Sequence, residues 1–139
     1  MSSTPGSDDI IFYMNILAGV VASFSGLVVG YIWYSVLFAK KWQKLSGVTD
    51  AQLNKGMLIR IIGSFAFSLI MSLNLAAFIG PDATPQFGLF AGMAAGIGWV
   101  AAAFGNNYLF EHRPLGLYFI NAGYNIVILS LMGLIIGLF

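Results

Sequence analysis

A run of twenty-four residues without a charged side chain, residues 87–110, reads FGLFAGMAAGIGWVAAAFGNNYLF. At a rise of about 1.5 Å per residue, a helix of this length crosses a hydrocarbon core of about 30 Å. Similar uncharged runs occupy residues 10–39, 61–79 and 115–139, and short connections join all four. The sequence therefore predicts a single all-α transmembrane domain over residues 1–139, an up-and-down bundle of four helices, with a flexible tail at residues 1–9.

The overall composition agrees with a membrane protein. Hydrophobic residues make up 59% of the chain and charged residues 8%, and the mean hydropathy is +0.88. Soluble proteins carry about a quarter charged residues. The absence of Cys and the single His exclude disulfides and the usual metal-ligand clusters within one chain, and a net charge of +1 argues against nucleic-acid binding. We expect no metal and no cofactor, and membrane lipid as a partner.

The cations lie on one side of the predicted membrane. Lys40, Lys41, Lys44, Lys55 and Arg60 surround the first connection, and Arg113 lies in the third. By the positive-inside rule both connections face the cytoplasm, so the chain is predicted to be N-out and C-out. In a bacterium this places a multi-pass protein in the inner (cytoplasmic) membrane.

The first connection, residues 40–56, is long enough to hold structure of its own. Thr49 followed by Gln52 has the spacing of a capping box, in which each side chain bonds the backbone N–H of the other residue. We expect a short interfacial helix from Asp50 to about Asn54.

Small residues recur at spacings of three and four in the spans, which places them on one face of each helix. In lipid, such faces allow close helix packing. The third span should be the central helix of the bundle because its small-residue stripe is the longest. The predicted packing residues are Gly19, Ser23, Gly26, Gly30, Gly88, Gly92, Ala95, Gly98, Ala102, Gly105, Gly133 and Gly137.

Polar and aromatic side chains gather toward the basic connections. Asn121 and Asn125 lie four apart, hence on one helical face, and an amide network between the third and fourth spans is geometrically available. This cluster either forms a polar pocket or joins neighbouring helices by hydrogen bonds. The candidate residues are Trp33, Tyr34, Arg60, Asn106, Asn107, Tyr108, Glu111, Asn121, Tyr124 and Asn125.

Three further contacts follow from depth in the bilayer. Arg60 is expected to pair with Glu111 across the bundle. Asn15 and Asn74 lie near the outer ends of antiparallel spans, and we predict a hydrogen bond between them. Trp99 falls at the middle of the third span, where its indole N–H finds no water, so it should face inward to a Ser or Asn.

Ionisable side chains are missing from the depth of every span. Proton- or sodium-coupled transport usually needs such a group. Hydrolysis within the membrane would need a nucleophile paired with a base, and none is available. The sequence therefore favours a protein that is not an enzyme.

Several motifs resemble a known family. The stretch 30–38 reads GYIWYSVLF and is followed by Trp42 and Gly47; later come NYLFE at 107–111, FINAGY at 119–124, and Met132 with Gly133. These residues resemble the small membrane proteins of domain of unknown function 1761. The resemblance implies a four-helix bacterial inner-membrane protein and brings no activity with it.

Three functions remain compatible with the sequence. The leading hypothesis is action by association, as a homo-oligomer or as an accessory subunit of a membrane complex. A second is a passive channel or a carrier of a neutral or amphiphilic solute, with the third span lining the path. A third is binding of a lipid or small amphiphile at the polar and aromatic cluster.

Overall fold

The computed structural model describes the backbone from Pro5 and the side chains from Asn15, both to Phe139. The described backbone contains helices and no strand. In chain order the elements are α1 (Pro5–Tyr31), the π-helix η1 (Ile32–Leu37), α2 (Ala39–Ser46), α3 (Asp50–Asn54), α4 (Met57–Ile79), α5 (Pro85–Ala95), the π-helix η2 (Gly96–Ala101), α6 (Ala102–Phe110) and α7 (Leu115–Leu138).

Four stretches are long and apolar enough to cross a membrane, which confirms the number of predicted spans. They are Asn15–Leu37, Met57–Ile79, Pro85–Phe110 and Leu115–Leu138. Of the predicted tail, α1 already includes residues from Pro5 onward, and residues 1–4 lie outside the described part.

The predicted capping box is confirmed at the start of α3. Thr49 Oγ1 accepts a hydrogen bond from the Gln52 backbone N–H at 3.2 Å, and the Thr49 backbone N–H donates to Gln52 Oε1 at 2.9 Å. Thr84 likewise caps α5 by accepting from the Phe87 N–H at 3.1 Å. These caps satisfy backbone donors that a helix leaves free at its start.

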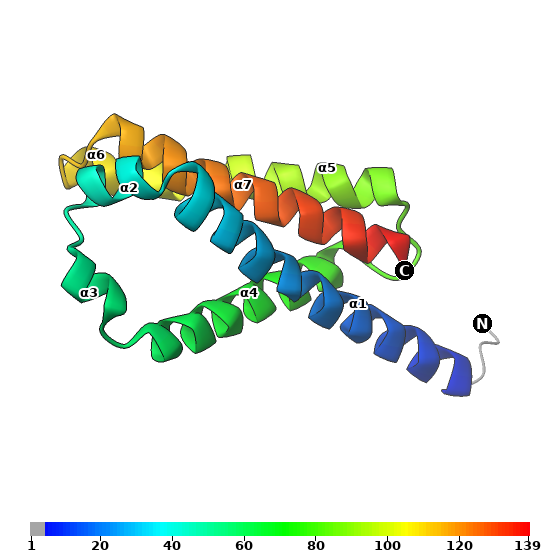
Figure 1. The fold of residues 1–139 in the computed structure, drawn as a ribbon. Helices are drawn as coiled ribbons and strands as arrows, with labels where there is room; N and C mark the ends of the chain where they lie inside the picture. The colour runs from blue at the N-terminus through cyan, green and yellow to red at the C-terminus, as the bar shows by residue number, and fades with distance from the viewer. Residues whose placement is uncertain (1–4) are drawn as a thin grey trace.

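The helix at the centre of the bundle is α7, and the expectation that the third span is central is wrong. In Figure 1, α5 and α6 lie along α7, whereas α1 and α4 cross each other. α7 contacts α1, α2, α4, α5, η2 and α6. It is also the most buried of the four spans, because 39% of an apolar 18-residue stretch of it is buried, more than in any other span.

One end of the bundle carries all six Lys and Arg residues, and we call it the basic end. It holds α2, α3 and the turn between α6 and α7, while the C-terminus lies at the opposite end (Figure 1). α4 leans away from the other helices as it approaches α3 (Figure 1). The four spans are therefore packed unevenly, with α4 the least enclosed at the basic end.

α1 and α4 pack through small and hydroxyl side chains. Gly26 lies against Ser68, and Gly19 lies against Leu73. The buried Ser72 Oγ donates a hydrogen bond to the Gly19 carbonyl at 2.6 Å. Such pairs of a small residue with a hydroxyl are the expected means of association in lipid, where the hydrophobic effect contributes little.

α5 and α7 approach so closely that their backbones touch at glycines. A Cβ added to Gly88 would overlap the Gly133 carbonyl, and one added to Gly92 would overlap the Leu129 carbonyl. Gly137 faces Thr84 and Pro85 in the same way. These predicted packing glycines therefore lie at the contact between α5 and α7.

Two members of the predicted third-span stripe, Gly98 and Ala102, are exposed instead of packed. A Cβ at Gly98 would meet nothing within 4 Å. The cause is η2, because a π-helix inserts an extra residue into the turn and shifts every later side chain around the axis. Within η2, the two buried residues, Gly96 and Ala101, are accordingly five residues apart.

The other predicted packing residues lie inside the bundle. Ser23 is fully buried and donates to the Val20 carbonyl. Gly30 faces the Tyr124 ring, Ala95 packs against the core, and a Cβ added to Gly105 would meet the Tyr118 ring at 3.7 Å.

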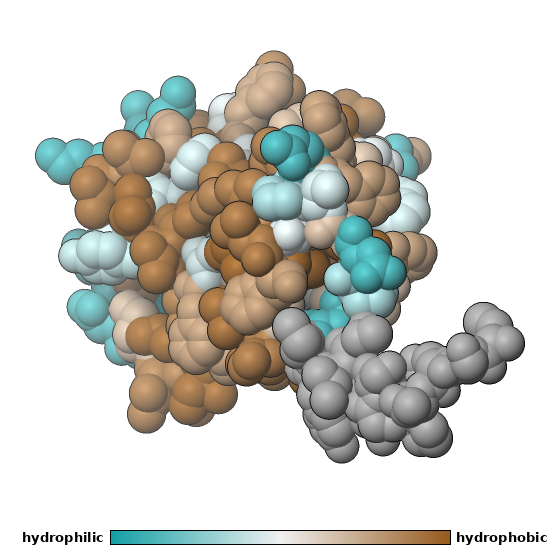
Figure 2. Space-filling model, turned by 90° about the vertical axis from the view of Figure 1, so that its right-hand side faces the viewer, coloured by the Kyte–Doolittle hydropathy of each residue, from teal (hydrophilic) through white to brown (hydrophobic). Residues whose placement is uncertain are grey.

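The outside of the bundle is largely hydrophobic. Leu58, Ile59, Phe67, Phe90 and Phe110 are all at least two thirds exposed. Viewed from the end that holds the C-terminus, hydrophobic residues cover most of the visible surface, with hydrophilic ones scattered among them (Figure 2). This surface suits contact with lipid.

Candidate functional site

A hydrogen-bonded network at the basic end joins three helical segments through Asn121 on α7. Tyr34 Oη, from η1, donates to Asn121 Oδ1 at 2.7 Å. Asn121 Nδ2 in turn donates to Tyr108 Oη, from α6, also at 2.7 Å. A single amide thus ties the first, third and fourth spans together.

Neighbouring aromatic residues donate hydrogen bonds from their polar groups to backbone carbonyls. Trp33 Nε1 donates to Ile120 O at 2.9 Å, and Tyr124 Oη donates to Gly26 O at 2.8 Å. The rings of Tyr34 and Tyr124 meet edge to face with centroids 5.0 Å apart. These contacts bring aromatic side chains of the first and fourth spans together at the basic end.

Tyr118 was missed from the sequence as a member of the cluster, whereas Trp42 belongs to the motif noted there. Tyr118 Oη donates to the Ala101 carbonyl of η2 at 2.9 Å, and the ring of Trp42 lies 5.7 Å from that of Tyr34. Tyr118 precedes Asn121 by three residues, a helical spacing that puts both on one face of α7 and offered a usable signal.

Four predicted members lie outside the network. Asn106 and Asn107 are exposed. The predicted pair of Arg60 with Glu111 is wrong, because Glu111 lies 4.0 Å from Arg113 and Arg60 donates to backbone carbonyls at the end of α3. Those carbonyls lack partners within so short a helix, and a guanidinium with five donors can serve several of them.

The network is internally satisfied. Within the described residues, every buried side-chain nitrogen or oxygen has a hydrogen-bond partner. Tyr108 is 9% exposed and carries the Arg113 guanidinium over its ring at 4.7 Å. Little donor or acceptor capacity is left over for a ligand, so the arrangement joins helices.

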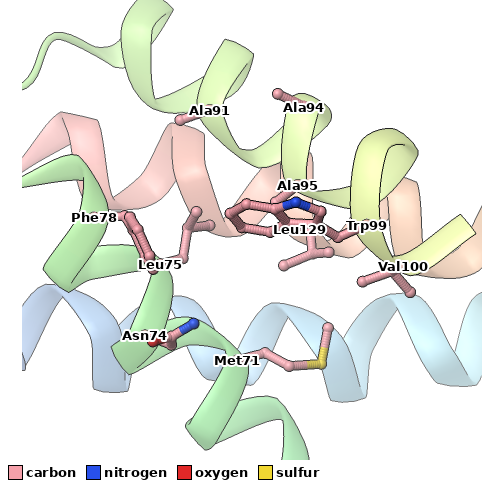
Figure 3. Close-up of a pocket in the computed structure, with 10 residues that line it drawn as sticks. All are labelled: Met71, Asn74, Leu75, Phe78, Ala91, Ala94, Ala95, Trp99, Val100 and Leu129. Atoms are coloured by element: carbon pink, nitrogen blue, oxygen red, sulfur yellow. The ribbon is translucent and has the colours of Figure 1, made fainter. Parts of the chain in front are cut away.

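An open cavity of about 530 Å³ lies at mid-span, between α4, α5, η2 and α7. Figure 3 shows Trp99 extending across it toward Phe78, and the two ring centroids are 6.0 Å apart. Trp99 is 65% exposed, so the prediction that it faces inward to a Ser or Asn is wrong. The displacement again follows from η2, which contains it.

The predicted hydrogen bond between Asn15 and Asn74 is also wrong. Asn15 Nδ2 donates to the Ala76 carbonyl at 3.2 Å, and Asn74 is exposed beside the cavity (Figure 3). On a helix, residues two apart point in nearly opposite directions. Because Ala76 faces α1, Asn74 faces away from it.

A second open feature is a groove of about 420 Å³ between α4 and α7 at the basic end. Its polar lining comes from Arg60, Ser64, Ser68, Tyr124 and Asn125. Three of these, Arg60, Tyr124 and Asn125, were predicted as site residues, although from a different arrangement. No group of three or more His, Cys, Asp or Glu that would hold a metal occurs among the described residues.

Comparison with known families identifies the chain. One family model matches residues 17–137, nearly the whole bundle and all of the network described above. The chain belongs to the family of protein of unknown function DUF1761. No curated protein and no solved structure gives a match. For this DUF1761 member the resemblance seen in the sequence is confirmed, and function has to be argued from its own residues.

Proposed function

We propose that this DUF1761 protein acts by association in the membrane, as a homo-oligomer or as an accessory subunit of a larger complex, and is not an enzyme. The observation that carries the proposal is the outer face of the third span. Ala94, Gly98 and Ala102 are small residues, and all three are exposed. Exposed small residues let a second helix approach closely in lipid.

These three residues are not needed for packing within the chain. At Gly88 and Gly92 the lack of a side chain lets the α7 backbone approach closely, whereas a Cβ added to Gly98 would meet open space. The space next to Gly98 is therefore free to receive a helix from another subunit.

Gly98→Leu is expected to abolish self-association while leaving the monomer folded, because the added side chain points into open space. The matched control is Gly63→Leu on α4, since a Cβ at Gly63 also meets nothing within 4 Å. Native mass spectrometry after gentle extraction reports the subunit number of each variant. Equal assembly in wild type and Gly98→Leu would refute the interface, and stoichiometric foreign subunits in the wild type would identify an accessory role.

The orientation we propose is N-out and C-out in a bacterial inner membrane, supported by the six cations at one end. The wild-type chain has no Cys, so single cysteines can be labelled selectively. We expect Asp82→Cys, in the connection between α4 and α5, to react with a membrane-impermeant maleimide in spheroplasts. Asn54→Cys in α3 should react only after lysis. The reverse pattern would invert the orientation.

A further inference from the structure

The groove between α4 and α7 has a polar side that descends from the basic end. Arg60, Ser64 and Ser68 follow one another at intervals of four residues on α4, hence on one face. Across the groove lies Asn125, whose Nδ2 donates to the Asn121 carbonyl at 2.9 Å. Its Oδ1 remains as an acceptor beside the groove.

Arg60 provides a fixed positive charge at the mouth of this groove. Its guanidinium donates to the carbonyls of Gln52, Leu53 and Lys55, which hold it against α3. A guanidinium has five N–H donors, so donors remain for an anion. No carboxylate among the described residues forms an ion pair with Arg60, whose side chain is exposed.

Below Ser68 the groove becomes apolar. Met71 and Ile128 line it there, and Met71 also lines the mid-span cavity that contains Trp99. From Arg60 to Met71 the α4 axis rises by about 16 Å, close to half of a hydrocarbon core of about 30 Å. A cationic mouth, a hydroxyl and amide zone, and an apolar floor thus follow one another over the depth of one leaflet.

From this order we infer that the groove binds an anionic phospholipid of the leaflet at the basic end. The phosphate contacts Arg60, the glycerol and ester groups lie at the level of Ser64 and Asn125, and one acyl chain passes Met71 toward the mid-span cavity. Charge complementarity favours this occupant, because the basic end carries six cations and, among the described residues, only Asp50 and Glu111 as anions.

A transmembrane helix from another subunit fits the same groove less well. Its apolar side chains would offer the Arg60 charge no counter-ion and the Ser64 hydroxyl no partner, which is costly within a membrane. The association face proposed above is centred on Gly98, which does not line the groove. The lipid site and the association face are therefore separable by mutation.

The test measures lipid binding to the full chain in detergent micelles by native mass spectrometry. Phosphatidylglycerol and phosphatidylcholine with identical acyl chains are titrated separately. We expect the wild type to prefer phosphatidylglycerol, and Arg60→Gln to weaken its binding by about tenfold, as loss of one well-placed cation should. Inorganic phosphate should not compete, because it lacks the acyl chain that occupies the apolar floor.

Arg60→Gln and Gly63→Leu test the groove itself, and Lys44→Gln and Gly98→Leu serve as controls. Gly63→Leu places a side chain in the groove wall and should also weaken lipid binding. Because this variant leaves the contacts of Arg60 with α3 in place, it still tests the groove if Arg60→Gln displaces α3. Lys44→Gln removes a cation from α2 at the same end, outside the groove, and should bind like the wild type. Gly98→Leu should lose assembly and keep the lipid.

The outcomes separate the lipid site from the association face. Equal affinity for the two lipids, or equal losses in Arg60→Gln and Lys44→Gln, would overturn the site in favour of general attraction to the basic end. If Gly63→Leu dissociates an oligomer and leaves lipid binding intact, the groove belongs to a second copy of the chain. Intact assembly in Gly98→Leu with selective loss in Arg60→Gln would refute the association face alone.

Discussion

Gly92→Ala is expected to destabilise the protein by about 1–3 kcal/mol, the usual cost of forcing extra atoms into a well-packed core. A methyl group on Gly92 would overlap the Leu129 carbonyl of α7, and a backbone cannot move aside as a flexible side chain can. The rest of α5 would have to shift away from α7, which would also separate Gly88 from Gly133.

The matched change in the same span has the opposite sign. Gly98→Ala meets open space, and replacing glycine by alanine inside a helix contributes up to about 1 kcal/mol of stability. Thermal or denaturant unfolding in one detergent, followed by circular dichroism, compares the two variants. If both alanines change stability alike, the close contact between α5 and α7 is refuted.

Much of the local structure was predictable because it depends on spacing within one helix. The spans follow from uncharged length, and the α3 cap follows from Thr49 and Gln52. The common depth of Tyr34, Tyr108 and Asn121 near the basic end was also visible, although the sequence left open whether their side chains meet. Each of these arguments needs only the geometry of a regular α-helix.

The errors arose where the helix is not regular or where tertiary contacts select among equal candidates. The π-helix η2 rotated Gly98, Trp99 and Ala102 out of the positions that an α-helical count gives them. The long side chain of Arg60 could reach several acceptors, and it donates hydrogen bonds to free carbonyls at the end of α3 instead of pairing with Glu111. Neither outcome leaves a signal in a single sequence.

The two errors concern the parts of the molecule that the proposals use. Gly98 became available to another subunit only because η2 turned it outward, and Arg60 became available to an anion only because it does not pair with Glu111. α5 and α7 pack through backbone contact. α4, leaning outward at the basic end, leaves the groove open (Figure 1).

Asn121→Leu is expected to cost about 1–3 kcal/mol of unfolding free energy, from two interhelical hydrogen bonds of about 0.6–1.7 kcal/mol each in a membrane protein. The substitution leaves Tyr34 Oη without its acceptor and Tyr108 Oη without its donor. Tyr108 is 9% exposed, so water cannot readily replace the lost partner.

Removing the orphaned hydroxyls should recover much of the loss. In the Asn121→Leu background, Tyr34→Phe combined with Tyr108→Phe eliminates the unpaired polar groups, and replacing both partners by apolar groups is often nearly neutral. The same unfolding assay measures the triple variant. A triple variant as unstable as Asn121→Leu alone would show that the cost comes from shape and not from the unpaired hydroxyls.

Lipid binding in Asn121→Leu decides between the two interpretations of the cluster. If the network only joins helices, the variant should lose stability and keep its affinity for phosphatidylglycerol, because Asn125 donates to the backbone carbonyl of residue 121, which the substitution retains. If the network is itself the binding site, affinity should fall with stability in Asn121→Leu and should not return in the triple variant, which restores packing without restoring the amide.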